Sequence, residues 1–196
     1  MRSYAKAALL ALLVAVLVRG EVLQAYKIPS GSMLPTLQLG DYVLINPLAY
    51  GLRLPLLGGW LLRWREPQPG DVVVFISPKD PTQDYVKRVA AGAGELVEIR
   101  DKQLFVDGRP RAAPTAYFAG AAEHVQLSVP RDNFGPTPVP TGQLFVLGDN
   151  RDQSFDSRFW GFVDVRDVLG KAFLVYWSVD GEDGWIRWER LGAMVR

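Results

Sequence analysis

Most of the chain alternates between short apolar runs and turn-forming residues. Apolar runs bounded by Gly, Pro, Asn and Asp are typical of β-strands. They predict strands at residues 41–46, 72–76, 84–91, 96–100, 103–106, 143–147 and 168–179. The run 72–76 lacks alternation, so we expect it to be buried on both faces. The pattern therefore predicts a mainly β fold, an antiparallel and barrel-like domain with a small inserted cap.

Turn residues divide this domain further. Asp101-Lys102 predicts a hairpin between 96–100 and 103–106, and Asp107-Gly108 predicts a second turn. Residues 47–69 and 107–140 have no clear period, and we interpret the second stretch as a loop-rich insertion. The predicted β-rich domain thus comprises 26–106 and 141–184, followed by a short amphipathic tail at 185–196.

The N-terminus carries an unbroken apolar run from Ala7 to Val18, flanked by Lys6 and Arg19. A run this short fits a signal-peptide core, a buried helix or part of a membrane span. The sequence after it is a poor cleavage site, and the run has no polar face. A helix extended from Ser3 to about residue 22 reaches spanning length. We therefore expect a transmembrane anchor within 1–25, with the N-terminus cytoplasmic and the body outside.

Composition narrows the possible chemistry. The net charge of +1 gives no argument for a nucleic-acid partner, and 196 residues suffice for a real core. The absence of cysteine excludes disulfides, a Cys nucleophile and Cys-ligated metal. His124 is the one histidine and the one candidate base for a Ser-His-Asp triad. A serine served by a neutral lysine is the remaining covalent option.

The candidate serines lie in the segment Ser30-Gly31-Ser32, between Pro29 and Pro35. Gly31 permits a backbone that brings two hydroxyls and nearby N–H groups to one point, as an oxyanion hole requires. The alternative is a serine-rich structural turn between prolines, and this segment taken alone favours that alternative.

The candidate lysine is Lys87, within the apolar predicted strand 84–91. A general base must be unprotonated, and only burial without a carboxylate partner lowers a lysine pKa from about 10.4 to near neutrality. The alternative is an ordinary lysine on an edge strand. A third block, 148–163, is rich in turn formers and in charges of both signs, then ends in aromatic residues. It predicts a polar network beside a core, or else a surface loop with weak ion pairs.

Together these blocks resemble bacterial type I signal peptidases (leader peptidases). The segments 28–37, 40–41, 70–76, 84–88 and 148–163 occur in that family's order, and the N-terminal anchor also matches. The resemblance implies a membrane-bound serine endopeptidase that removes signal peptides from exported preproteins after small-x-small (Ala-x-Ala) sites. It implies no cofactor, metal or nucleic acid, and it places the enzyme in the cell membrane with its catalytic domain on the outer face.

The resemblance also implies roles for individual residues. Ser32 would be the nucleophile, Lys87 the general base, Ser30 an oxyanion donor and Ser154 the group that orients Lys87. Arg88, Asp149, Asp156 and Arg158 would form a supporting ion-pair network. Two shallow pockets for small side chains would be lined by Tyr26, Ile28, Met33, Leu37, Val43, Val74, Asp84 and Val86.

Two other functions compete with this one. An anchored β-rich binding or assembly protein would use the same serine and lysine structurally. A self-cleaving repressor-type protease can use the same dyad, but it needs an internal cleavage site and usually a DNA-binding helix pair, for which the N-terminal apolar run leaves no room. The leucines and tryptophans of 47–69 fit either the bilayer surface or the core.

Overall fold

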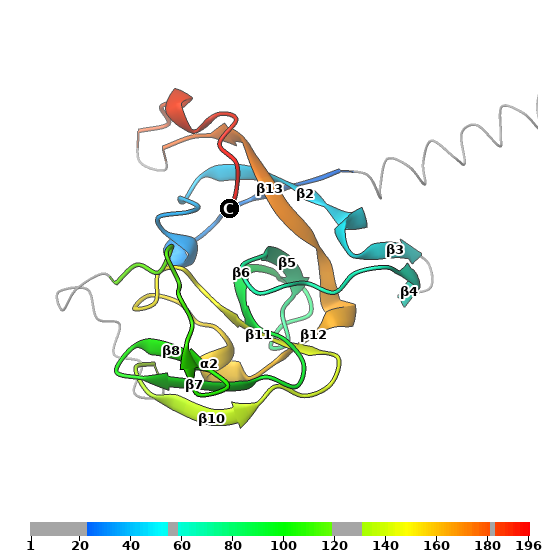
Figure 1. Cartoon of the computed structure of the whole chain (residues 1–196). Coiled ribbons are helices and arrows are strands. Elements are labelled where there is room, and N and C mark those ends of the chain that lie inside the picture. Colours follow the sequence, from blue (N-terminus) through cyan, green and yellow to red (C-terminus); the bar gives the residue numbers. More distant parts are fainter. Residues whose placement is uncertain (1–22, 55–58, 119–130, 181–182) are drawn as a thin grey trace, which may run out of the picture.

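Antiparallel strands dominate the chain, as the computed structural model in Figure 1 shows. The structure describes residues 23–54, 59–118, 131–180 and 183–196. The expected anchor at 1–25 lies outside these residues except for its last three positions, where strand β1 (Gln24–Lys27) already begins. No helix in the described ranges has the length and apolar character needed to cross a membrane.

The main sheet has seven strands in the order β1-β2-β13-β5-β6-β11-β12. Beyond β1, its strands are β2 (Asp41–Asn46), β5 (Val72–Ile76), β6 (Asp84–Ala91), β11 (Gln143–Leu147), β12 (Val163–Asp164) and β13 (Val168–Ser178). The predictions for β2, β5, β6, β11 and β13 are confirmed, while β1 and β12 were not predicted. All neighbours in this sheet pair antiparallel.

A second sheet of four strands has the order β10-β7-β8-β9. The predicted hairpin joins β7 (Leu96–Arg100) to β8 (Gln103–Val106) across Asp101 and Lys102, which both have positive φ as a two-residue turn of this kind requires. Segment 107–140, expected to be loop-rich, also contributes β9 (Arg109–Pro110) and β10 (Phe134–Pro138). Their short length and prolines removed the alternation that identifies strands.

Residues 47–69 contain a separate two-stranded hairpin, β3 (Gly51–Leu54) with β4 (Gly59–Arg63). Its sequence gave no strand signal because apolar residues follow one another without alternation. The helices are short: α2 (Ser157–Trp160) and 3-10 turns at Gly31–Met33, Pro47–Ala49, Val165–Asp167 and Trp188–Arg190.

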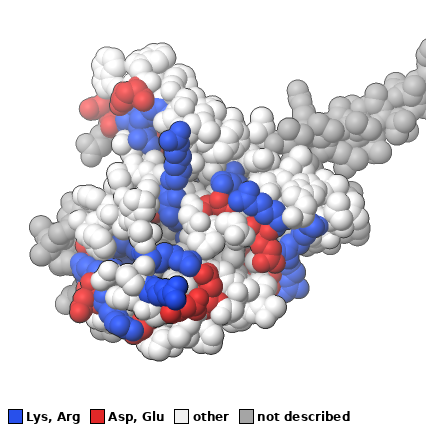
Figure 2. Space-filling view, viewed as in Figure 1, with Lys and Arg blue, Asp and Glu red and all other residues white. Residues whose placement is uncertain are grey.

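The core lies on both faces of the central strands. Val72 and Val74 pack into one hydrophobic cluster, whereas Val73 and Phe75 pack into another. The expectation that the run 72–76 is buried on both faces is therefore confirmed for its first four residues. A third cluster connects β11 to the second sheet through Phe145 and Leu147. Figure 2 shows basic and acidic side chains interleaved on the viewed face.

Candidate active site

Ser32 lies in the 3-10 turn Gly31–Met33, directly after β1 leaves the main sheet. The segment 148–150 fixes the backbone of this turn. Asn150 N–H donates to the Ser32 carbonyl at 3.1 Å, and Asn150 Nδ2 donates to the Gly31 carbonyl at 3.2 Å. The hydroxyls of Ser30 and Ser32 are 3.3 Å apart. The turn therefore presents two serine hydroxyls at one point, and strand β11 leads into the residues that hold it.

Lys87 reaches the same point from β6. Its Nζ donates to Ser32 Oγ at 2.8 Å and to the Val86 carbonyl at 3.1 Å. The residue is only 5% exposed. β11 pairs with β6 only from Arg88 onward, so the β6 backbone at Lys87 is unpaired on that side. The alternative of an ordinary lysine is nevertheless wrong, because its side chain is buried against Ser32 instead of extending into solvent.

Burial lowers the pKa of Lys87 to about 8. Desolvation is the main cause, because it penalises the charged ammonium. The negative charges of Asp156 and Asp149 raise the pKa, whereas Arg158 lowers it. No carboxylate in the described chain forms an ion pair with Lys87. The ring of Tyr85 lies 5.7 Å from Nζ. A lysine in this setting has a substantial neutral fraction near neutral pH and can accept a proton.

The first ion pair of the predicted network joins Arg88 to Asp149. Arg88 Nε and Nη2 each donate to one carboxylate oxygen of Asp149 at 2.7 Å. Thr36 and Thr115 also donate to this fully buried carboxylate. The geometry is bidentate, which makes the pair stronger and more directional than a single contact. It connects β6, directly after Lys87, to the segment that holds Ser32.

The second ion pair joins Arg158 to Asp156, both of which are buried. Asp156 also caps α2 and accepts a hydrogen bond from Gly148 N–H at 3.0 Å. Arg158 donates to the carbonyls of Arg131 and Arg151. The segment 148–163 is therefore a polar network beside the core, and its interpretation as a solvated surface loop is wrong.

Gly148 separates the backbone of Ser32 from the side chain of Ser154. A Cβ at Gly148 would come 2.2 Å from Ser154 Oγ and 2.5 Å from the Ser32 carbonyl oxygen, so only glycine fits. The predicted hydrogen bond from Ser154 to Lys87 is not present in the structure. Ser154 Oγ is buried and has no hydrogen-bond partner in the described part of the chain.

A cavity of about 370 Å³ opens in front of Ser32 and Lys87. Five of the eight predicted pocket residues line it: Tyr26, Ile28, Met33, Asp84 and Val86. The other three, Leu37, Val43 and Val74, do not reach its surface. They are fully buried in the hydrophobic cluster that also contains Ile28 and Met33. They support the cavity wall from within the core.

Sequence reasoning missed several residues of the site. Gln153 and Phe155 line the cavity, and Asn150 anchors the Ser32 turn. Arg190, in the tail that was set apart from the domain, pairs with buried Asp41 at 2.6 Å and donates to the Thr36 carbonyl. The turn-rich composition of 148–155 signalled the first three. No sequence pattern indicates that the tail holds the loop after Ser32.

The described residues contain no group of three His, Asp or Glu side chains arranged to hold a metal ion. The chemistry that this site supports is hydroxyl nucleophile chemistry. A serine hydroxyl and a buried amine are in contact at the end of a cavity, and a second hydroxyl lies beside them.

Comparison with known proteins agrees with this chemistry. The family described as "Signal peptidase, peptidase S26" matches residues 1–177. Signal peptidase I of Pseudomonas fluorescens is 36% identical, across 89% of this chain and 72% of that protein. Signal peptidase I of Aquifex aeolicus is 32% identical, across 86% and 81%. A solved signal peptidase I from Enterococcus faecalis is 34% identical, with a TM-score of 0.44 across 55% of this chain and 97% of that one.

The family match covers residues 1–177, and the Pseudomonas relative aligns with 89% of the chain. The chain therefore belongs to the signal peptidase family, peptidase S26, and is a serine endopeptidase of the signal peptidase I group.

Proposed function

We propose that this enzyme cleaves signal peptides with Ser32 as nucleophile and Lys87 as general base. One observation carries the proposal. A hydroxyl at the end of an open cavity contacts, at 2.8 Å, a buried lysine that has no carboxylate partner among the described residues. A structural lysine in the interior is normally paired, because an unpaired buried ammonium is costly. Once Lys87 has lost its proton, its amine can accept the proton of Ser32.

The reaction follows from this contact. The neutral amine of Lys87 takes the proton of Ser32 Oγ as that oxygen attacks the scissile carbonyl carbon. The resulting ammonium returns this proton to the leaving amine, so the C–N bond breaks and an acyl-enzyme ester remains. Lys87 then takes a proton from a water molecule that attacks the ester carbonyl carbon. The bond from that carbon to Ser32 Oγ breaks, the Lys87 ammonium returns its proton to Oγ, and the signal peptide leaves with a new C-terminal carboxyl group. The Ser30 hydroxyl and the Ser32 N–H serve as donors to the oxyanion.

The remaining polar residues hold this arrangement. The pairs Arg88–Asp149 and Arg158–Asp156 fix β6 and the segment after β11 relative to the Ser32 turn. We assign Ser154 as the group that orients the Lys87 amine. Its buried hydroxyl has no partner among the residues that the structure describes and lies against Gly148, which itself contacts the Ser32 backbone. A rotating hydroxyl in that position is available to the amine once substrate binds.

Two open strand edges favour an extended substrate at this cavity. β1 is at the end of the main sheet, and β11 pairs with β6 only from Arg88 onward, so residues 84–87 keep an unpaired edge. A substrate strand added there would place alternate side chains into the cavity. Its apolar wall of Ile28, Met33 and Val86 favours small side chains, as Ala-x-Ala sites provide.

We also propose that the enzyme is anchored to the cell membrane by its N-terminal apolar segment, with the catalytic domain on the outer face. Leu61, Leu62 and Trp64 of the β3–β4 hairpin are more than half exposed. Gln24 pairs with Ile45 near the end of β2 that leads into this hairpin. The described chain therefore starts near the end of β2 that leads to these exposed apolar side chains, where a bilayer surface would bury them beside the proposed anchor.

The test uses the full chain in lipid vesicles and a preprotein with an Ala-x-Ala site. The wild type is expected to release the signal peptide at that site, with a rate that rises between pH 6 and 10 as Lys87 loses its proton. Ser32→Ala is expected to release none and to lose labelling by a serine-directed covalent probe.

Ser77→Ala is the matched control, because Ser77 is a buried hydroxyl outside the cavity. It is expected to keep both cleavage and labelling. Cleavage that persists in Ser32→Ala would exclude Ser32 as the nucleophile. A preprotein with leucine at the residue before the cut tests the specificity, because the proposal requires that it is not processed.

A further inference from the structure

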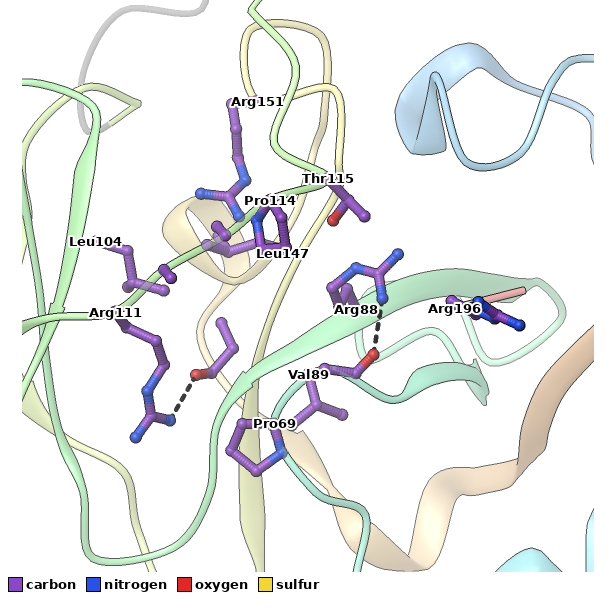
Figure 3. A pocket seen from close by; sticks show the side chains of 14 residues that line it. Pro69, Arg88, Val89, Leu104, Arg111, Pro114, Thr115, Leu147, Arg151 and Arg196 are labelled. Atoms are coloured by element: carbon purple, nitrogen blue, oxygen red, sulfur yellow. Dashed lines mark hydrogen bonds between the residues drawn. The ribbon is translucent and has the colours of Figure 1, made fainter. Parts of the chain in front are cut away.

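A second cavity, of about 470 Å³, lies away from the Ser32–Lys87 contact, where β6, β8 and the segment 111–115 meet (Figure 3). Its lining contains neither Ser32 nor Lys87, and it shares no residue with the cavity in front of them. Four arginines border it: Arg88, Arg111, Arg151 and Arg196. No acidic side chain lines it among the described residues.

Arg151 is the unusual member of this set. It is only 6% exposed, and the single hydrogen bond of its side chain to the described residues runs from Nε to the Gly148 carbonyl. Its two terminal nitrogens have no partner among the described residues, and no described carboxylate forms an ion pair with it. Figure 3 shows its guanidinium extending toward Pro114 and Leu147 in the cavity. A buried guanidinium normally has a carboxylate or another anion beside it.

The neighbouring charges do not compensate Arg151. Asp149 binds Arg88 and Asp156 binds Arg158, so both carboxylates are already held by bidentate partners. Asp152 pairs with Lys102. Arg111 forms an ion pair with Glu95 and donates a hydrogen bond to the Ala90 carbonyl. Desolvation lowers the pKa of Arg151 and the charge of Arg158 lowers it further, while the charges of Asp156 and Asp149 offset only part of this lowering.

The walls define the rest of the ligand. Apart from the arginines, they are mainly apolar, with Val89, Leu104, Pro114 and Leu147 among them. A small inorganic anion would pair with the Arg151 guanidinium but would leave the apolar cavity walls exposed to water. We propose that this cavity is a second binding site, for a small organic anion whose carboxylate or phosphate is held by Arg151 and whose apolar body contacts β6 and β8.

Octanoate is the probe, and two controls each offer one of its contacts: 1-octanol has the apolar chain without the charge, and inorganic phosphate has the charge without the chain. Titrations of the full chain in a non-ionic detergent, corrected for detergent alone, are expected to show saturable octanoate binding at one site per chain. Octanol and phosphate are each expected to bind at least about tenfold more weakly, because each lacks one of the two contacts.

Two variants locate the site. Arg151→Met keeps the side-chain length and is expected to weaken octanoate binding about tenfold or more. It should change thermal stability little, because removal of an unpaired buried charge offsets the lost hydrogen bond to the Gly148 carbonyl. Ala113→Phe, which fills the cavity, is expected to abolish binding while Arg151 remains. Arg109→Met is the control for a lost positive charge, because Arg109 is exposed and does not line this cavity.

Four results would overturn the proposal. Octanoate binding unchanged in Arg151→Met would show that the guanidinium does not hold the anion. Octanol binding as tight as octanoate would leave a merely apolar cavity. Phosphate binding as tight as octanoate would show that the walls contribute nothing. A folded Ala113→Phe variant that still binds octanoate would place the ligand elsewhere.

Discussion

Two lysines of the main sheet stand opposite the same residue and have different surroundings. Lys87 on β6 pairs across with Val73 of β5, and Lys171 on β13 pairs with Val73 from the other side. Lys171 Nζ meets the carboxylate of Asp71 at 2.5 Å, and its side chain is 33% exposed. Lys87 meets a hydroxyl and a carbonyl, and it is 5% exposed.

The difference shows that the partner, and not the strand position, decides what a lysine can do. A carboxylate and water stabilise the ammonium of Lys171, so it serves as a structural cation. Lys87 has neither, and its pKa falls to about 8. The same side chain in the same row of the sheet is therefore available as a base at one position only.

The largest effect is expected when each lysine is replaced by methionine. Lys87→Met should reduce preprotein cleavage about a thousandfold, because the proton of Ser32 then has no acceptor. Lys171→Met removes an equally placed lysine and should leave the rate of cleavage nearly unchanged. Initial rates at saturating preprotein measure both. Equal losses in the two variants would show that the partners of the lysines do not matter.

How far the sequence predicts this contrast depends on the residue. The strand containing Lys87 was predicted from its apolar neighbours, and Lys171 lies in the long strand predicted at 168–179. Which lysine has a carboxylate depends on β5, β6 and β13 being adjacent, and strand order is a long-range property that no local pattern reports. The assignment of Lys87 came from a family resemblance, not from its surroundings in the sequence.

The same limit applies to the site as a whole. Blocks of turn formers at 148–156 indicated a polar network, because such residues rarely gather beside aromatics without one. Side-chain packing in three dimensions decides two other features of the site. Ser154 Oγ has no hydrogen-bond partner among the described residues, and Leu37, Val43 and Val74 lie behind the cavity wall. The hold of Arg190 on Asp41 joins residues 149 positions apart, and no periodicity could reveal it.

The second prediction concerns the paired charges around Lys87. Asp149→Asn should lower the free energy of unfolding by about 3–5 kcal/mol, because Arg88 would remain buried without its carboxylate. Chemical denaturation at pH 7 measures the loss. Glu98→Gln breaks the exposed pair with Arg100 and should change stability little, which makes it the matched control. An equally small effect at Asp149 would mean that the network does not stabilise the site.

The third prediction uses pH to measure the isolation of Lys87. The pKa of Lys87 is about 8 in the folded protein, against 10.5 for a lysine without such an environment. Between these pH values the unfolded chain keeps the lysine protonated, whereas the folded protein has lost that proton. Stability therefore rises with pH across this range, and the full penalty applies below it. The free energy of unfolding of Lys87→Met, measured relative to that of wild type, should therefore fall by roughly 3 kcal/mol between pH 7 and 10.5. Ser32→Ala retains Lys87 and should follow the wild type. Parallel curves for Lys87→Met and wild type would contradict the lowered pKa.

The smallest effect is expected from removing the partner of Lys171. Asp71 accepts hydrogen bonds from Tyr50, Gln68 and Lys171. Burial alone would raise the pKa of Asp71, but these three bonds lower it below its ordinary value. Asp71→Asn should therefore cost about 1–2 kcal/mol at pH 7, because one charged acceptor is lost while solvent still reaches Lys171. The cost should disappear as pH falls below about 3.8, where the wild-type carboxylate also takes up a proton. Cleavage should be unaffected, since Lys171 is not in contact with Ser32. A variant that loses cleavage but not stability would show that Asp71 acts on the catalytic site, and the separation between the two lysines would then be incomplete.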